Sequence, residues 1–483
     1  QVLILLPEIS LTPNIEKRFT NRIGFNPEIW HSKISISKKR KIWNGCYLGE
    51  VKIVVGARSS LFLPFKNLGL IIVDEEHDIS YKQEDGVRYQ ARDMAVVRSN
   101  MEKIPIILSS ATPSIETYLN IKKKRYEHIF LSKQYSGFDL PRTHLINLQK
   151  EKLSKNRWIS DRIINGITNC LNNNKQSLIF LNRRGYAPLT ICSSCGYRIQ
   201  CEYCSSWLVM HNKKRILCCH HCGFTKSLLD KCLKCNSENS LKFIGPGIER
   251  IAEELKDNFP KANIEILSSE NMNTHKKISE IINRIEQKKI DIMVGTQILA
   301  KGHHFPNLSL VGVIDADAGL MGGDLRASEH TYNLLQQVSG RAGRSIEVGD
   351  VYIQTYFENN PLIQSLKKHD RESFLKYTLN DRKNFNLPPY VHLISLIFSG
   401  FSKGEVFSYS KKTIKKFPIK EDISILGPVE APIFLLRGRY RYRVLLRGSK
   451  RKELNLYVEK WLKNITLPHS IRLITDVNPY TFM

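Results

Sequence analysis

Three acidic residues and a histidine directly follow a short apolar segment near the start of the chain. Residues 70–73 are Leu, Ile, Ile and Val, and residues 74–77 are Asp, Glu, Glu and His. A short apolar run that ends in polar residues is typical of a buried strand in a parallel sheet. Ligands bind beyond the carboxyl ends of such strands, where carboxylates can hold a metal ion and activate a water molecule. A solvated acidic turn is the alternative interpretation.

Two later segments combine glycines with basic residues. The first, VGTQILAKGHHF at 294–305, contains Gly302 after an expected strand, and the second, QVSGRAGR at 337–344, contains Arg341 and Arg344. Glycines let the backbone approach phosphate groups, and an arginine fork can contact a γ-phosphate. Taken alone, a basic glycine-containing loop is more often only solvated.

Cysteines with metal-ligand spacing are concentrated in one segment of about fifty residues. Eight of the 11 cysteines form CxxC pairs, and two such pairs can supply four sulfurs to one tetrahedral zinc ion. We therefore expect two structural zinc sites, and core cysteines or disulfides are the weaker alternative. Spacing does not reveal the pairing, but the economical arrangement is nested, with the outer pairs on one ion and the inner pairs on the other. The expected ligands are Cys192, Cys195, Cys201, Cys204, Cys219, Cys222, Cys232 and Cys235.

Three cysteines do not fit the zinc pattern. Cys218 lies beside Cys219, but only Cys219 has the two-residue spacing to Cys222. Cys46 and Cys170 have no partner at ligand spacing, so we expect them to be small buried hydrophobic residues.

An alternating basic segment, LLRGRYRYRVLLR, occupies residues 435–447. In a strand it would place four arginines on one face and bury Tyr440, Tyr442, Val444 and Leu446 on the other. An arginine row suits the phosphates of single-stranded DNA. The alternative is an edge strand that is charged to deter aggregation. The predicted DNA-contacting residues are Arg437, Arg439, Arg441 and Arg443.

The elements that must position these residues form an α/β protein with inserted and appended parts. Strands are expected at 2–6, 51–55, 70–73 and 104–108, followed in a second lobe by 177–181, 264–267, 290–294, 310–314 and 351–355. Residues 246–260 have the spacing of an amphipathic helix. We expect a first lobe at 1–128, a second lobe at 129–189 and 242–360, a zinc-binding insertion at 190–241 and a small α+β C-terminal domain at 361–483.

The totals agree with a nucleic-acid-binding protein. The 483 residues carry a net charge of +27 and a pI near 9.6, which favours a polyanionic partner. No apolar run reaches the roughly 18 residues that a membrane helix requires, so no membrane partner is expected. Cysteine pairs that bind zinc are typical of a reducing compartment, which predicts a cytoplasmic location.

Together these segments resemble a known family. The ordered set LPEISLT, GARSSLF, DEEH, SSATPS, LIFLNRRGYA, the cysteine insertion, GPGIERIAEEL, VGTQILAKGHHFPNL, QVSGRAGR and LPPY is similar to the PriA family of superfamily 2 replication restart helicases. The resemblance covers essentially the whole chain. It implies two RecA-like lobes with ATP in the cleft between them, two zinc ions, and a 3′→5′ DNA helicase that recognises stalled or repaired forks and initiates primosome assembly.

The resemblance also implies roles for individual residues. Asp74 would hold Mg²⁺, Glu75 would activate the attacking water, and His77 with residues 110–112, including Thr112, would couple ATP to DNA. Gln337, Arg341 and Arg344 would contact the phosphates, with Gly302 also at the nucleotide. Single-strand-binding protein and other primosome proteins are the partners that the family implies, besides forked and single-stranded DNA.

The sequence departs from the family pattern in a way that bears on activity. The family has a GxxxxGK(S/T) phosphate loop (the Walker A loop) ahead of the LPEISLT segment, and a DNA-binding domain ahead of that loop. Neither lies in these 483 residues. Val87 stands where a bulky aromatic residue is expected, and ILSSENMN at 266–273 lacks the expected Arg and Asp. A DNA-binding primosome scaffold that does not hydrolyse ATP is therefore the alternative function, and the coding sequence upstream of Gln1 would distinguish the two.

Overall fold

The protein divides into two compact units in its computed structural model. The first contains Gln1–Lys133 with Lys301–His304, and the second contains Gln134–Ala300 with Phe305–Met483. The structure describes residues 1–7, 19–131, 140–151, 153–154, 157–181, 189–192, 199, 201–202, 208–211, 216–218, 224–227, 231–238, 241–244, 247–268, 271, 275–296, 305–317, 326–342 and 348–480.

The first unit is built on a five-stranded parallel sheet in the order β2-β3-β1-β4-β7. Its strands are β1 (Val2–Leu5), β2 (Glu28–Trp30), β3 (Ile53–Gly56), β4 (Leu70–Val73) and β7 (Ile106–Leu108), and its main helices are α2 (Ile36–Leu48), α3 (Ala91–Glu102) and α4 (Ile115–Lys122). Apolar residues of the strands and of α2 and α3 form one core, in which Cys46 is completely buried. Burial raises the pKa of its thiol to about 11, as expected for a cysteine that acts as a small hydrophobic residue.

The second lobe lies in the second unit and has a six-stranded parallel sheet in the order β15-β16-β9-β17-β18-β8. The strands are β8 (Arg142–Asn147), β9 (Gln176–Phe180), β15 (Ile264–Leu267), β16 (Ile292–Gly295), β17 (Leu308–Val313) and β18 (Asp350–Thr355). The helices are α5 (Asp161–Asn172), α6 (Ile248–Asn258), α7 (His275–Glu286) and α8 (Ala327–Ser339). Helix α5 packs tightly on this sheet, because a Cβ atom at Gly166 would lie 2.6 Å from the Leu310 side chain.

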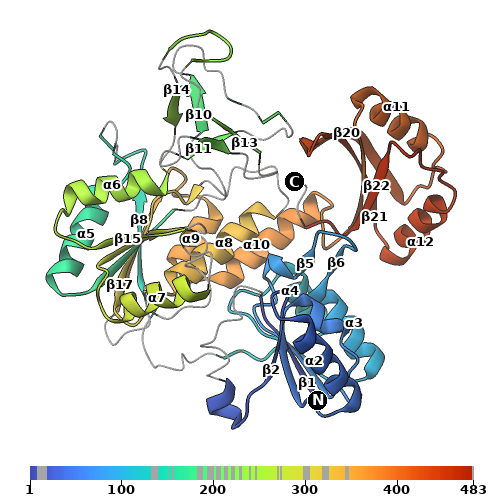
Figure 1. Ribbon diagram of the computed structural model, residues 1–483, viewed down its shortest axis with the longest axis horizontal. Coiled ribbons are helices and arrows are strands. Elements are labelled where there is room, and N and C mark those ends of the chain that lie inside the picture. The colour runs from blue at the N-terminus through green and yellow to red at the C-terminus, as the bar shows by residue number, and fades with distance from the viewer. Residues whose placement is uncertain are drawn as a thin grey trace. The chain divides into compact units, whose positions relative to one another are not determined.

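A small antiparallel sheet of five strands interrupts this lobe between β9 and α6 (Figure 1). Its order is β13-β12-β11-β10-β14, with strands β10 (Leu189–Cys192), β11 (Val209–His211), β12 (Ile216–Cys218), β13 (Thr225–Ser227) and β14 (Leu241–Ile244). The insertion therefore lies where the cysteine pattern predicts it.

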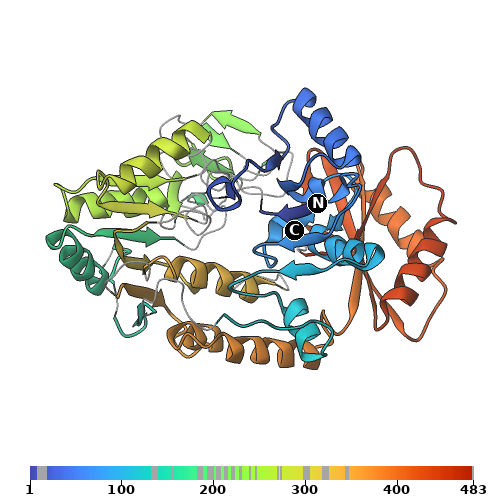
Figure 2. The same cartoon turned by 90° about the horizontal axis from the view of Figure 1, so that it is seen from below.

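The chain then passes through two helices into a four-stranded antiparallel sheet. Helices α9 (Pro361–Lys367) and α10 (Arg371–Asn384) precede a sheet in the order β20-β21-β19-β22. Its strands are β19 (His392–Gly400), β20 (Ile423–Leu436), β21 (Arg439–Gly448) and β22 (Arg472–Val477), and α11 (Lys403–Ile414) and α12 (Arg451–Leu462) cover one face of it (Figure 1). Within the second unit, α8 and α10 lie side by side, as Figure 2 also shows.

The strand predictions are confirmed to within two residues, and β4 and β15 match the expected ranges at both ends. The short edge strand β2 and the edge strand β8 were not predicted, because their sequences have no continuous apolar run. In the part of the chain that the structure describes, no helix is long and apolar enough to cross a membrane.

Candidate functional site

The acidic segment follows β4, at the edge of the first sheet where all of its parallel strands end. Strand β4 pairs with β1 on one side and β7 on the other, so residues 74–77 lie beside the ends of both neighbours. The Asp74 amide donates to the Leu5 carbonyl (3.0 Å), and the Glu76 amide donates to the Ser109 carbonyl (3.1 Å). The backbone of the acidic segment is therefore bonded across three strand ends.

Glu75 has a left-handed backbone conformation with φ of 47°. This conformation is unusual for a residue other than glycine and costs about 1–3 kcal/mol. A turn holds it, because the Asp78 amide donates to the Glu75 carbonyl (2.8 Å). The Glu75 side chain remains 37% exposed and Asp74 is half-buried, so both carboxylates can contact a ligand at this edge.

His77 contacts the SSATPS segment that follows β7. Its Nδ1 atom lies 2.7 Å from the Ser110 hydroxyl and 3.5 Å from the Glu75 carboxylate, and its Nε2 atom lies 3.3 Å from the Thr112 hydroxyl. The structure therefore brings together Glu75, His77 and Thr112, which the sequence assigned to one site. A change in the position of the Glu75 side chain can therefore be transmitted to the SSATPS segment through the buried imidazole of His77.

Glu76 was quoted in the motif but was not predicted to be a site residue. It is completely buried, and its carboxylate accepts from the Ser114 amide (2.6 Å), the Ser114 hydroxyl (3.0 Å) and Nη1 of Arg92 (3.1 Å). Ser114 is also the N-cap of α4. Glu76 therefore links the acidic segment to the start of α4 and to Arg92 of α3. No local sequence pattern reveals contacts between residues so far apart in the chain.

Tyr81 supports the acidic segment from below. Its hydroxyl donates to the Asp74 carbonyl (2.6 Å) and also lies within hydrogen-bond distance of the Leu5 carbonyl (3.0 Å). Burial, together with the carboxylates of Asp74 and its neighbours, raises the pKa of this hydroxyl far above its usual value. The neutral hydroxyl therefore connects the end of β1 with Asp74 after β4.

The predicted residues of the second lobe are only partly described. Gln337 lies in the last turns of α8, and Arg341 is buried two residues after the helix ends, with its amide donating to the Val338 carbonyl (3.0 Å). Gly302 and Arg344 lie outside the described residues. Their predicted roles stay predictions.

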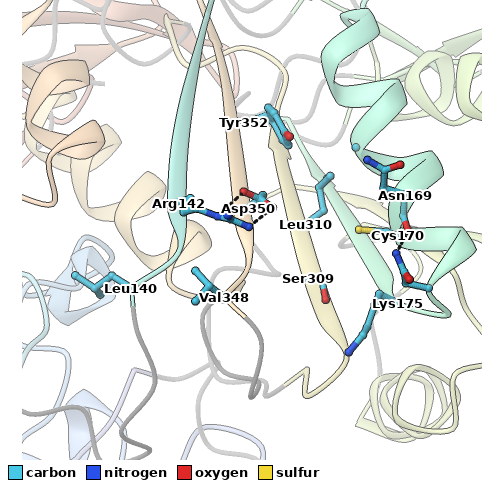
Figure 3. Close-up of a pocket in the computed structure, with 12 residues that line it drawn as sticks. Leu140, Arg142, Asn169, Cys170, Lys175, Ser309, Leu310, Val348, Asp350 and Tyr352 are labelled. Carbon is cyan, nitrogen blue, oxygen red and sulfur yellow. Dashed lines mark hydrogen bonds and ion pairs between the residues drawn. The ribbon is translucent and has the colours of Figure 1, made fainter.

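An open pocket of about 820 Å³ in the second lobe contains none of the predicted site residues among the described residues that line it. It is lined by Gly166 and Cys170 of α5 and by residues at the amino ends of β8, β17 and β18 (Figure 3). The carboxyl ends of β16 and β17 lie at the other edge of the sheet, and β16 leads there into the VGTQILAKGHHF segment. Within the pocket, Asp350 already pairs with Arg142 (3.3 Å) and His144 (2.8 Å).

Family models match four parts of the chain. A "DEAD/DEAH box helicase" model matches residues 1–121, "Helicase conserved C-terminal domain" matches 226–345, "PriA DNA helicase Cys-rich region (CRR) domain" matches 201–226, and "Primosomal protein N C-terminal domain" matches 383–480. The replication restart protein PriA of Rickettsia conorii is 46% identical over 482 residues, which cover 100% of this chain and 74% of the relative. The chain belongs to the PriA family.

A more distant PriA, from Bacillus subtilis, is 35% identical over 490 residues, which cover 100% of this chain and 61% of the relative. Among solved structures, RecG bound to a three-way DNA junction is 14% identical with a TM-score of 0.42, over 78% of this chain and 40% of that one. A likeness at that level carries no argument here. The predicted fold class of the chain, two helicase lobes with a cysteine-rich insertion and a C-terminal domain, is confirmed.

In the cysteine-rich sheet, the strand termini that border the CxxC pairs in the sequence lie at one end. Cys192 ends β10 opposite Leu241, the first residue of β14, and Cys218 ends β12 opposite Val209, the first residue of β11. Because these pairings are antiparallel and Leu189 also pairs with Val209, the end of β10 lies on the same side as the start of β11. In the sequence, the pairs 192/195 and 219/222 come at or directly after the ends of β10 and β12, and the pairs 201/204 and 232/235 come before the starts of β11 and β14.

The strand order also bears on which pairs share an ion. The outer pairs, 192/195 and 232/235, adjoin the neighbouring strands β10 and β14, and the inner pairs adjoin the neighbouring strands β11 and β12. This order supports the nested arrangement. Cys195, Cys204, Cys219 and Cys222 lie outside the described residues, and in the described part of the chain no group of three or more His, Cys, Asp or Glu is placed to hold a metal.

The turn at Cys232 fits a metal-binding knuckle. Cys232 is completely buried, and the Lys234 amide donates to its sulfur (3.4 Å), while the Asn236 amide donates to its carbonyl (2.9 Å). An amide aimed at a sulfur stabilises a thiolate, which is the form that binds zinc. The donor set at this turn is therefore suited to zinc.

The predicted arginine row on β21 needs correction. Arg437 lies with Gly438 in the turn before β21, both with positive φ, and is not in the strand. Arg441 is only 8% exposed and donates Nη1 to the Ile433 carbonyl (3.3 Å), and burial lowers the pKa of the Arg443 guanidinium. The expected burial of Tyr442, Val444 and Leu446 is confirmed, Tyr440 is only partly buried, and the opposite face is partly covered as well.

Cations lie against aromatic rings at two places in this domain. The Arg439 guanidinium lies 4.1 Å from the ring centre of Phe401, which is 65% exposed. The Lys403 ammonium lies 5.0 Å from the ring of Phe434, which packs 5.3 Å from the ring of Tyr440, the residue that follows Arg439 in β21. We call these two groups, Phe401 with Arg439 and Lys403 with Phe434 and Tyr440, the aromatic–cation surface.

Proposed function

We propose that this protein is an ATP-dependent DNA helicase that moves 3′→5′, recognises stalled or repaired replication forks and initiates primosome assembly. The observation that carries the proposal is the bonding of the acidic segment to the SSATPS segment through His77 and Glu76. A helicase must transmit the state of its nucleotide to its DNA-contacting loops, and this network joins a metal-and-water site to a second loop. The relatives named replication restart protein PriA support the same role.

In this proposal Asp74 binds Mg²⁺ and Glu75 activates the attacking water. Asp74 offers a half-buried carboxylate, and the left-handed backbone of Glu75 holds its side chain at the same edge. We assign the phosphate contacts of the second lobe to Gln337, Arg341, Arg344 and Gly302. Buried arginines suit charge that develops on a transferred phosphoryl group.

We further propose that two zinc ions fold the cysteine-rich region. Cys192, Cys195, Cys232 and Cys235 would hold one ion, and Cys201, Cys204, Cys219 and Cys222 would hold the other. The end-of-sheet placement and the turn at Cys232 support this assignment. Closed four-sulfur sites stabilise a fold and do not carry out catalysis.

We propose that the C-terminal domain contacts single-stranded DNA through its aromatic–cation surface and the exposed turn residue Arg437. Exposed aromatic rings stack on bases, and basic residues beside them neutralise phosphates. Single-strand-binding protein and other primosome proteins are the further partners that we propose.

The deciding experiment measures DNA-stimulated ATP hydrolysis by the full-length natural protein. Glu75→Gln should lower kcat by about 10²–10⁴-fold, because it removes the proposed general base and keeps the side-chain volume. Glu50→Gln, an exposed glutamate of the same unit, is the matched control and should hydrolyse ATP at the natural rate.

Equal rates for the natural protein and Glu75→Gln would reject Glu75 as the catalytic residue. A natural protein that binds forks but hydrolyses no ATP would favour the alternative, a primosome scaffold without ATPase activity.

A further inference from the structure

Two arginines converge on one buried carboxylate at the start of α8. Glu329, in the first turn of this helix, is 6% exposed. Its Oε2 atom lies 3.3 Å from Nη1 of Arg326 and 3.1 Å from Nη2 of Arg382, which comes from α10. Removing one partner of such a buried group leaves an uncompensated charge, so loss of any of these contacts is expected to disturb the start of α8.

The same two arginines contact the two ends of the C-terminal domain. Arg382 donates Nη1 to the Pro388 carbonyl (3.0 Å), in the segment that leads into β19. The Arg326 guanidinium lies 4.0 Å from the ring centre of Tyr480, a buried residue that follows β22. The family match to this domain spans residues 383–480, so residues near the start and at the end of the domain both contact the Glu329 group.

Helix α8 connects this junction to the arginine-containing segment. Tyr332 of α8 stacks on Phe374 of α10, with ring centres 4.1 Å apart and an interplanar angle of 9°. After α8 ends, the Gly340 amide donates to the Gln336 carbonyl (3.0 Å), and the Arg341 amide donates to the Val338 carbonyl (3.0 Å). Arg341 is therefore bonded to the end of a helix whose first turn is held by the C-terminal domain, about 18 Å away along the helix.

We propose that Glu329 is a positioning residue that makes the C-terminal domain part of the ATPase machinery. The domain holds Arg326 through Tyr480 and Arg382 through Pro388, the two arginines hold Glu329, and Glu329 sets the position of α8 and hence of Arg341. The inference rests on the proposed role of Arg341 in ATP hydrolysis. It explains why an ion triad is buried between two helices that already pack through aromatic rings.

The first arm of the test measures the junction without any ATP hydrolysis. In the full-length natural protein, Tyr480→Leu removes the aromatic face under Arg326, and Tyr480→Phe keeps it. We expect amide hydrogen exchange in α8 to speed up by about two- to thirtyfold in Tyr480→Leu and to stay unchanged in Tyr480→Phe. The control is Tyr377→Leu, at a tyrosine of α10 that is 52% exposed. Equal α8 exchange in all four proteins would overturn the inference.

The second arm measures steady-state ATP hydrolysis at saturating single-stranded DNA. Tyr480→Leu should lower kcat by about two- to thirtyfold and leave the KM for ATP unchanged, because a displaced Arg341 weakens the transition state more than ground-state binding. Tyr480→Phe should restore the natural kcat. A natural kcat in Tyr480→Leu would overturn the inference. If the natural protein hydrolyses no ATP, the proposed function fails, and the exchange arm still decides whether the junction exists.

Discussion

The segment after β4 and the strand β21 both carry conspicuous charged residues, but different kinds of neighbour place those charges. After β4, the amides of Asp74 and Glu76 bond at the ends of the adjacent parallel strands, and the side chains of Glu76 and His77 bond to residues that follow β7. Along β21, the exposure of the arginine side chains depends on what covers the second face of the antiparallel sheet. The comparison shows that a charged cluster after a parallel strand predicts its surroundings better than an alternating pattern within a strand.

The physical reason lies in the topology. All strands of a parallel sheet end at one edge, so polar residues after successive strands must meet there. Alternation along a strand separates two faces but does not say which face is buried, and here Arg441 is buried although its face is rich in arginine. Each of the following changes tests one side of this contrast.

The largest expected effect on stability follows from Glu76→Ala in the first unit. The change leaves Arg92 and the Ser114 amide without their buried carboxylate, and breaking a buried ion pair typically costs about 3–5 kcal/mol. Urea unfolding followed by hydrogen exchange of α3 and α4 should show a loss of that size. Glu50→Ala, at an exposed position, is the control. A loss below about 1 kcal/mol would show that the network is not a stabilising unit.

A smaller loss is expected for Arg441→Leu in the C-terminal domain. The change removes a buried charged donor to the Ile433 carbonyl, and hydrogen bonds to charged groups contribute about 1.5–3 kcal/mol. Arg437→Gln, in the exposed turn four residues earlier, should stay within about 0.5 kcal/mol of the natural protein. Urea unfolding of the two variants measures both values. Equal stability of the two would mean that Arg441 is exposed in solution, as the sequence pattern suggested.

The sequence predicted most strands of the two parallel sheets, the presence of a cysteine-rich insertion, and the position of residues 74–77 at the end of a strand. Apolar runs and cysteine spacing are local signals, which is why these features could be read from the sequence. It did not predict the partnership of Glu76 with Arg92 or that of Glu329 with Arg382, which joins residues 53 positions apart. Such pairs depend on which helices pack together, and packing follows from the whole core. The turn at Arg437 and Gly438 was missed for a simpler reason, since an arginine in a left-handed conformation has no distinctive sequence pattern.

Phe401→Ala should weaken binding of single-stranded DNA without changing the fold of the C-terminal domain. Phe401 is 65% exposed, so its loss removes little core contact, but stacking on one base contributes about 1–3 kcal/mol to binding. Fluorescence anisotropy with a labelled oligonucleotide measures the change. Ile419→Ala, a fully exposed apolar residue of the same domain, is the matched control. Equal affinity for the two variants would exclude Phe401 from the DNA surface.

The smallest effect is expected in the salt dependence of DNA binding by Arg437→Gln. Each phosphate that a basic residue neutralises adds about 0.7 to the slope of log K against log salt on a single strand. Arg437 is exposed in the turn before β21, whereas Arg441 is held inside the sheet by its bond to Ile433. The slope should therefore fall by about 0.7 in Arg437→Gln. An Arg437→Gln slope equal to that of the natural protein would remove the turn from the DNA contact and leave the aromatic–cation surface as the candidate for phosphate binding in this domain.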